Sequence, residues 1–341
     1  MPTTWGQPPA MTFRGREKDR LVALKPVLFS RAAQPAGTYS GKPRSFCLAD
    51  DRAVENIHPL VRDAMLDYFK SRGIAWHRGE GQPTNHLCSS QVACINALGP
   101  MMTDPDLLAD AFRAYYPNLS EPLPLDADGE LPGGGHPFLG FEWIGTQSYL
   151  GERNWGTRGA NCTSADFVFR FRSYDNKIHL ILGEWKYTEE YPRSLLKRAD
   201  INRTRWDTYV DLYRRWATAC GDSVPPYEAL FVEPFYQLMR QALLAKEMER
   251  SRRSGPGEIE ADVVSVLHVS PQANREFAQR FTSPSLAQYG RTVTEAWTRI
   301  DCPEKFLAIS SESLLTSVEL AAGANHAEWA EWLLLRYGWW R

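Results

Sequence analysis

The sequence predicts an α/β fold of the α+β kind, in which a central sheet is flanked by helices and further helices are added at both ends of the chain. Three observations predict it: two strand-like runs flank a turn within residues 163–187, apolar residues recur at helical spacing on both sides of this hairpin, and the elements follow the order helix, three strands, helices, strand. At 341 residues and 43% hydrophobic content, the chain is long enough to bury a substantial core.

The chain divides into an arm and one large domain. Residues 1–45 are rich in Pro, Gly, Arg and Ser and show little periodicity, so we expect an extended or weakly ordered arm. Residues 46–341 form the predicted single domain, with a core at about 85–270 and a C-terminal extension at 271–341.

Helices are expected before the hairpin. Residues 50–69 carry apolar side chains at helical spacing behind an acidic start, which predicts an amphipathic helix. A second helix runs to Leu98 from a cap at Asn85, and a third occupies residues 103–116, where a proline suits the first turn. Prolines at 117, 122, 124 and 132 and the glycine run 133–135 make residues 117–137 a long loop without regular structure.

The remaining elements follow from periodicity and β-branched content. We expect a first strand at 138–144, helices at 195–219 and 234–253, a buried strand at 263–269, an edge strand at 306–309 and a Trp-rich terminal segment at 327–340 that packs on the core.

The hairpin carries the candidate site. Its first run begins near Asp166, and its second run ends in Gly-Glu-Trp-Lys at residues 183–186. Because side chains alternate along a strand, Glu184 and Lys186 share one face while Trp185 and Tyr187 share the other.

The register decides whether the carboxylates meet. If the loop has an odd length centred on Asp175, residue i faces residue 350 − i and Asp166 lies opposite Glu184. A two-residue loop at Asp175 and Asn176 would instead send Glu184 to the opposite face. We therefore predict an odd-length loop or a bulge.

Two opposed carboxylates repel each other unless a cation lies between them, and oxygen ligands favour Mg²⁺, with Mn²⁺ as the second choice. Lys186 can then orient or deprotonate the attacking water, or stabilise the charge that develops on phosphorus. The alternative is a solvated Glu-x-Lys pair on an exposed strand. The apolar run before Glu184 and the aromatic residues on the other face favour the site.

The pattern Asp166…Glu184-Trp185-Lys186 resembles the active-site signature of the PD-(D/E)XK nuclease superfamily, with Ala165 where a proline often precedes the Asp. Residues 86–91 and 234–241 look similar to a bacterial family described as restriction endonucleases. The resemblance implies a restriction-endonuclease-like core with a mixed central sheet, and a Mg²⁺-dependent DNA endonuclease of restriction or phage defence. It implies Asp166, Glu184 and the Trp185 carbonyl as metal ligands.

Further residues are candidates for the site. In the superfamily an additional acid often joins the metal, which makes Glu142 the first choice and Glu152 the second. Gln91, Tyr187 and Arg240 are candidates for contacts with nucleic acid or for supporting contacts, although polar residues of these kinds more often face solvent or pair locally.

Composition excludes several classes. The net charge of −2 gives no global basic signature, although residues 11–44 hold eight Lys or Arg against two acids and residues 193–215 hold seven against three. Six cysteines without a Cys-x-x-Cys pair disfavour a zinc site and a disulfide scaffold. With no signal segment and no stretch long enough to span a bilayer, we expect a cytoplasmic protein without a membrane partner.

Three functions stay open at this stage. The first is the endonuclease, acting on double-stranded DNA, with a homodimer and RNA as open questions. The second is a nuclease-fold module without turnover that binds nucleic acid or a protein. The third is a glycosidase using Glu184 with Glu142 or Asp166, in which Lys186 has no obvious place.

Overall fold

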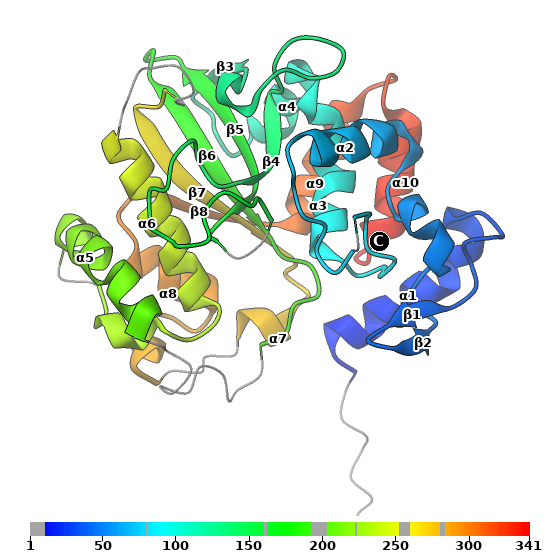
Figure 1. Cartoon of the computed structure of the whole chain (residues 1–341), viewed down its shortest axis with the longest axis horizontal. Helices are drawn as coiled ribbons and strands as arrows, with labels where there is room; N and C mark the ends of the chain where they lie inside the picture. The colour runs from blue at the N-terminus through cyan, green and yellow to red at the C-terminus, as the bar shows by residue number, and fades with distance from the viewer. Residues whose placement is uncertain are drawn as a thin grey trace, which may run out of the picture.

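The computed structural model describes residues 11–79, 81–159, 162–191, 203–221, 224–251, 260–279 and 284–341. Its centre is a mixed sheet in the order β3-β5-β6-β7-β8, with β4 also paired to β5 (Figure 1). The strands β3 to β6 pair antiparallel, whereas β6, β7 and β8 run parallel. The bounds are β3 (Leu119–Leu123), β4 (Leu139–Trp143), β5 (Ala165–Ser173), β6 (Ile178–Trp185), β7 (Val263–Ser270) and β8 (Phe306–Ser310).

The β5–β6 hairpin has the predicted register. Phe167 lies opposite Gly183, and every further pair of the hairpin keeps the sum of 350. The strands are joined through residues 174–176, where Asn176 adopts a left-handed φ of +64°. A turn followed by one left-handed residue is a common way to close a hairpin with an odd-length loop. The prediction of an odd-length loop is confirmed.

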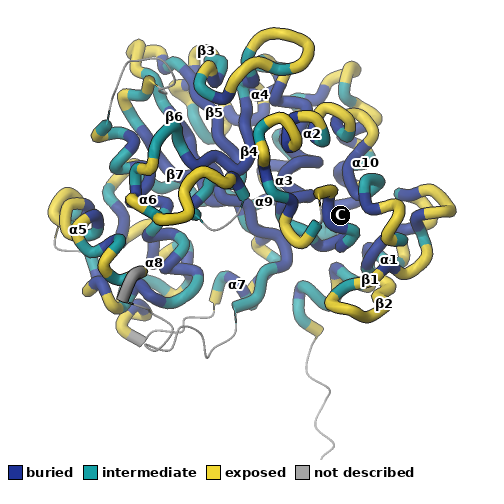
Figure 2. Tube along the Cα trace, viewed as in Figure 1, coloured by how far each residue is buried: buried dark blue, intermediate teal, exposed yellow. Residues whose placement is uncertain are grey.

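The sheet separates two hydrophobic cores, and helices cover both of its faces (Figures 1 and 2). Alternation along β5 places Phe167 and Phe169 in the first core and Val168 in the second. The first core is covered by α1 (Phe13–Leu28), α2 (Pro59–Ser71), α3 (Ser90–Leu98), α4 (Pro105–Phe112), α9 (Ser311–Ala322) and α10 (Ala327–Tyr337). The second is covered by α5 (Arg203–Cys220), α6 (Phe235–Ser251) and α8 (Val293–Ile300), while the short α7 (Arg275–Ala278) follows β7.

The predicted arm is wrong for the described residues 11–45. This segment forms α1 and a small hairpin of β1 (Gly37–Tyr39) and β2 (Lys42–Arg44). One side of α1 is buried and makes specific contacts: the Glu17 carboxylate accepts a hydrogen bond from the Tyr187 hydroxyl at 2.6 Å, and Lys25 Nζ donates to the Gln34 carbonyl at 3.0 Å. Residues 1–10 lie outside the described chain.

The helices before the hairpin exist with shifted bounds. The predicted helix at 50–69 is a 3-10 turn, η1 (Asp50–Asn56), followed by α2, because Pro59 favours an extended residue before it. Ser89 rather than Asn85 caps α3, by accepting a hydrogen bond from the Val92 amide. A 3-10 turn, η2 (Gly99–Met102), then leads to α4, which ends at Phe112 and not at 116.

The prediction of a structureless loop at 117–137 is also wrong. Within it lie β3, which pairs with β5, and the short η3 (Asp126–Asp128). Pro122 is tolerated because β3 is an edge strand, where a missing amide donor costs little.

The second half of the chain agrees with the prediction. The helices α5 and α6, the strands β7 and β8, and α10 occupy the expected places, and the expected start of α5 at 195 lies outside the described residues. Two 3-10 turns, η5 (Tyr227–Leu230) and η6 (Pro284–Tyr289), connect them.

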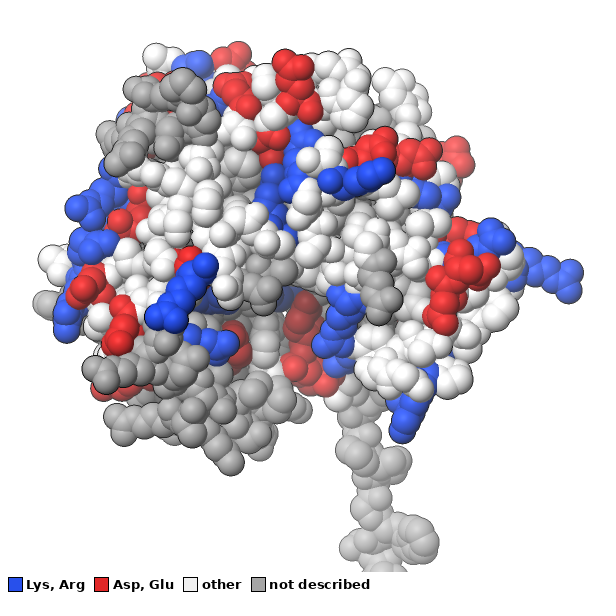
Figure 3. Space-filling view, viewed as in Figure 1, with Lys and Arg blue, Asp and Glu red and all other residues white. Residues whose placement is uncertain are grey.

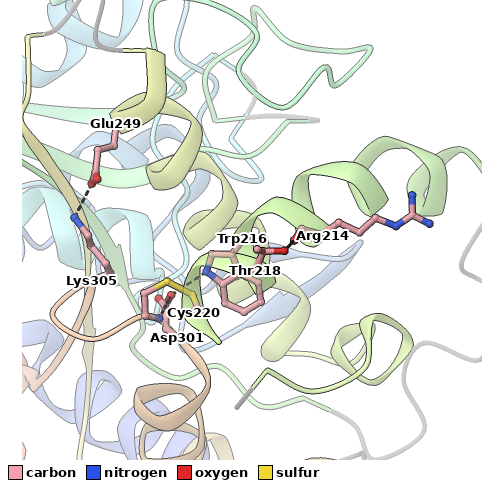
Figure 4. Close-up of a disulfide and its surroundings, with 8 residues drawn as sticks. Arg214, Trp216, Thr218, Cys220, Glu249, Asp301 and Lys305 are labelled. Carbon is pink, nitrogen blue, oxygen red and sulfur yellow. Dashed lines mark hydrogen bonds and ion pairs between the residues drawn. A yellow bond between two sulfur atoms is a disulfide. The ribbon is translucent and has the colours of Figure 1, made fainter. Parts of the chain in front are cut away.

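One covalent cross-link was not expected. Cys220 at the end of α5 forms a disulfide with Cys302, which follows α8 (Figure 4). The Trp216 indole donates to the Asp301 carboxylate at 3.0 Å beside it. The sequence disfavoured a disulfide scaffold, and it gave no signal for this single pair.

Among the described residues, no helix combines the length and the apolar character needed to cross a bilayer.

Candidate active site

Backbone pairing brings four titratable residues into one row across the sheet. The pairing of β4 with β5 places Glu142 opposite Asp166, and the hairpin register places Asp166 opposite Glu184. Glu184 in turn pairs with His268 on the parallel strand β7. We call Glu142, Asp166 and Glu184 the carboxylate row.

Asp166 opens β5 and is half-buried. Its Oδ2 accepts a hydrogen bond from the backbone amide of Trp185 at 2.7 Å. Burial raises the pKa of Asp166 well above its usual range, and the negative charges of Glu184 and Glu142 raise it further. The ammonium of Lys186 acts in the opposite direction. The row is therefore short of positive charge.

Glu184 and Lys186 form a buried ion pair. Glu184 is 1% exposed, and its Oε1 pairs with Lys186 Nζ, which also donates to the Gln237 side chain at 2.9 Å. Burial alone would lower the pKa of Lys186, but the charges of Glu184 and Asp166 raise it well above its usual range. The lysine is thus held as a cation next to the row.

Two amides of α6 hold Glu184 from above the sheet. Gln237 donates to one of its carboxylate oxygens and Gln241 to the other. These glutamines are one helical turn apart and therefore lie on the same face of α6. Neither glutamine was predicted from the sequence as a partner of Glu184. The signal available for Gln241 was a polar residue within the mostly apolar run 238–245, and the structure shows that it is 2% exposed.

Glu142 is 1% exposed and has a left-handed φ of +50°, so the backbone turns at this strand position. Gln91 Nε2 donates to its Oε1 at 2.7 Å, Ser164 Oγ donates to its Oε2 at 3.1 Å, and His77 Nε2 lies 3.4 Å from Oε1. Burial raises the pKa of Glu142, and a protonated His77 would oppose this. The structure thus brings Gln91 to the site, as predicted, and adds His77.

Cys94 of α3 was also not singled out by the sequence. It is 1% exposed, and its pKa is raised well above the usual value, first by burial and then by all three carboxylates of the row. It therefore lies beneath the row, as a neutral thiol.

Three other predicted residues lie elsewhere. The Glu152 carboxylate accepts hydrogen bonds from the amide and the hydroxyl of Thr163, at 2.8 and 2.6 Å, and does not join the row. Arg240 donates to the same hydroxyl at 3.2 Å. Tyr187 points into the first core and bonds Glu17. These positions do not support direct roles for Glu152, Arg240 and Tyr187. Both Trp185 and Tyr187 face away from the row, as alternation requires.

The donor set of the row fits a hard divalent cation. It offers carboxylate oxygens and no thiolate or imidazole pair, and buried like charges are stabilised by a cation between them. Mg²⁺ uses one or two carboxylates with several waters, and the half-buried Asp166 is the member of the row that faces solvent. Among the described residues, the one set of ligand-type side chains whose atoms all lie within 4.8 Å of one another is Cys220, Asp301 and Cys302, and its sulfurs are joined in the disulfide.

A mixed sheet covered by helices on both faces, with acids and a lysine on its central hairpin, defines the class of restriction-endonuclease-like proteins. A family model described as Restriction Endonuclease associating with ARP matches residues 28–338, and the chain belongs to this family. Membership points to a nuclease-type function, that of a hydrolase, with nucleic acid as the binding partner. Searches of curated proteins and of solved structures found no match.

Proposed function

We propose that this protein is a Mg²⁺-dependent phosphodiesterase of the PD-(D/E)XK type that cuts DNA, in a restriction or phage-defence setting. The observation that carries the proposal is the convergence of Asp166, Glu184 and Lys186 on one face of the β5–β6 hairpin, with Glu142 beside them. The family description supports the nuclease class.

Each residue has a separate task in this proposal. Asp166 and Glu184 would hold the ion, together with the backbone carbonyl of Trp185 and, through the same row, Glu142. A bound divalent cation polarises the phosphoryl oxygens and lowers the pKa of a bound water. Lys186 is charged and lies against Glu184, so it would orient the attacking water and stabilise negative charge on the reacting phosphate.

The second candidate is a nuclease-fold module that binds nucleic acid or a protein without cutting. One observation favours it: both oxygens of Glu184 already have partners, from Lys186, Gln237 and Gln241. In a nuclease, an incoming cation would replace some of these partners of Glu184. In a module that only binds, Glu184 would keep all of them.

Plasmid DNA separates the two candidates. The wild-type protein is incubated with supercoiled plasmid and Mg²⁺ or Mn²⁺, beside a Lys186→Ala variant, an EDTA control and an Arg113→Ala variant whose change lies on an exposed ion pair of α4. We expect cleavage by the wild-type and Arg113→Ala proteins alone. Binding without cleavage under either ion would refute the first candidate and support the second.

The finer parts of the proposal have their own tests. Linear plasmid that forms without a nicked intermediate requires two sites that act together, so a homodimer is then expected, and light scattering measures the mass. A matched RNA substrate that is cut as fast as DNA would contradict the preference for DNA. Unchanged phage plating on cells that express the protein would contradict the defence role for the phages tested.

A further inference from the structure

A recess lies next to the carboxylate row. It is a cavity of about 280 Å³ between α1, the start of α3 and the segment that follows Lys186. We call it the basic pocket. Its walls include Arg14, Tyr39, His77, Arg78, His86 and the start of α3 at Ser89, Ser90 and Gln91.

Cations without acidic partners gather at one wall of this pocket. Arg14 and Arg78 line it, and Lys18 lies behind His86. In the part of the chain that the structure describes, none of these three cations forms an ion pair. Arg14 Nε is buried without a hydrogen-bond partner there. Lys18 Nζ lies 4.0 Å from the centre of the Phe46 ring, and the Arg78 guanidinium lies 5.4 Å from that of Tyr39, so each of the two lies against an aromatic ring instead of an acid. Cations that converge on one cavity without acidic partners are the expected surroundings of an anion.

The same positive charges act on the pKa of His86. Burial lowers the pKa of His86 to about 3, and the positive charges of Lys18, Arg14 and Arg78 contribute. Its Nδ1 accepts a hydrogen bond from the Cys88 amide at 3.0 Å, so the neutral ring carries its proton on Nε2. That nitrogen has no partner among the described residues. The pocket wall thus holds an unused donor as well as cations that have no acidic partner in the described part of the chain.

The opposite wall is acidic, but one of its acids is occupied. The Glu189 carboxylate accepts hydrogen bonds from the Ser90 hydroxyl and from the Tyr187 amide. Glu190 lies on the same side. The pocket therefore suits one phosphate at its basic wall, with an uncharged part of the same strand against its acidic wall. On the face shown in Figure 3, acidic and basic side chains lie side by side at the hollow between α7 and α1.

The pocket and the carboxylate row share a wall. Gln91 and His77 both line the pocket, and both contact Glu142, at 2.7 and 3.4 Å. A polymer whose reacting phosphate lies at the row can therefore place a neighbouring unit in the pocket. The volume exceeds that of a phosphate group and leaves room for part of a nucleotide.

We infer that the basic pocket binds a backbone phosphate of the substrate strand next to the phosphate that is cut, with Arg14, Arg78 and the His86 Nε2 proton as donors. The inference rests on the proposed function, since it names the substrate contact of the same site. Phosphate contacts of this kind fix the position of the strand and carry no sequence information.

Salt-dependent binding tests the inference. Binding of a labelled duplex is measured by fluorescence anisotropy over a series of NaCl concentrations, in an Asp166→Asn background that prevents cutting. The Arg14→Ala, Arg78→Ala double variant is compared with Lys70→Ala, which removes an exposed cation of α2. One lost phosphate contact lowers the slope of log K against log salt by about 0.9, and we expect affinity to fall roughly tenfold near 0.1 M salt. Lys70→Ala should change neither.

A second measurement locates the phosphate. Duplexes that carry one neutral methylphosphonate linkage at successive positions should bind the background protein more weakly at one position beside the cut, and the double variant should not distinguish that position. Equal salt slopes for variant and background, or the same positional losses in both, would overturn the inference. A loss seen only with 5′-phosphorylated ends would assign the pocket to a terminal phosphate and overturn the backbone assignment.

Failure of the pocket and failure of the proposed function give different results. If the wild-type protein cuts plasmid while the double variant binds with an unchanged salt slope, only the pocket inference fails. If the background protein binds no duplex at any salt concentration, both fail.

Discussion

Replacing Lys186 with methionine tests the electrostatics of the site through stability. The change removes the charge that pairs with Glu184 and leaves a buried carboxylate beside Asp166. Breaking a buried ion pair by removing one partner costs about 3–5 kcal/mol. With about 2.1 cal/mol/K of unfolding entropy per residue, 341 residues give about 0.7 kcal/mol/K, so the Tm should fall by about 4–7 °C in EDTA.

A divalent cation should then take the place of the ammonium. Thermal unfolding with and without 10 mM Mg²⁺ should show a larger rise in Tm for Lys186→Met than for the wild-type protein, because the variant has more uncompensated negative charge. The double variant Glu184→Gln, Lys186→Met should lie close to the wild-type Tm in EDTA and gain less from Mg²⁺ than the single variant.

The control is Lys305→Met, which breaks a partly exposed pair with Glu249 elsewhere on the sheet. We expect a loss of about 1 kcal/mol or less and no special gain from Mg²⁺. Equal gains from Mg²⁺ in the wild-type, Lys186→Met and Lys305→Met proteins would refute the metal assignment of the row.

Three further changes have defined outcomes. The pKa of His86 is about 3 in the fold and about 6.5 in the unfolded chain, so the unfolded state binds more protons below pH 6.5. About 2 kcal/mol of the free energy of unfolding should therefore be lost between pH 7 and pH 5. Chemical denaturation should show a weaker pH dependence of this free energy for His86→Gln, and an unchanged pH dependence would contradict the reasoning. Gln241→Leu removes a donor to the site carboxylate and should lower metal affinity or cleavage rate 10–100-fold, whereas the exposed Gln288→Leu should leave both unchanged. Cys220→Ser opens a cross-link that spans 82 residues and should cost about 4–5 kcal/mol; a wild-type Tm that does not respond to dithiothreitol would contradict the disulfide.

The hairpin could be predicted because its rules are local. Alternation along a strand and the parity of a loop determine which residues face each other, and the pairing of Phe167 with Gly183 follows from them. The same logic extends to Glu142, since β4 continues the pairing across β5. The carboxylate row therefore follows from strand order and register.

The helix α1 could not be predicted because its buried side does not look apolar. Its buried residues are Phe13, Glu17, Leu21 and Lys25, spaced one turn apart, and two of the four are charged. Each charge is satisfied by a partner far along the chain or by a backbone carbonyl. The hydropathy pattern of such a segment predicts a polar arm, because the hydrogen-bond partners of its charged residues come together only in the folded structure.

The partners of the row escaped prediction for a similar reason. Gln241 reaches Glu184 across 57 positions, and His77 reaches Glu142 across a distance in sequence that no periodicity relates to the hairpin. Polar helix residues usually face solvent, so residue type alone predicts an exposed position for Gln241. The strand β3 was missed because its Pro122 suits an edge strand and not a central one.

The last helix has a consequence for the timing of synthesis. In α10, the Trp329 indole donates to the Asn96 carbonyl at 2.8 Å, the Tyr337 hydroxyl accepts from the Asn96 side chain at 3.0 Å, and Arg336 donates to the Asn56 carbonyl at 2.7 Å. The bonds to Asn96 brace α3, which carries Gln91, and the bond to Asn56 braces η1. A nascent chain whose α10 has not yet emerged from the ribosome has no such brace, so its centre becomes fully ordered only once α10 has docked.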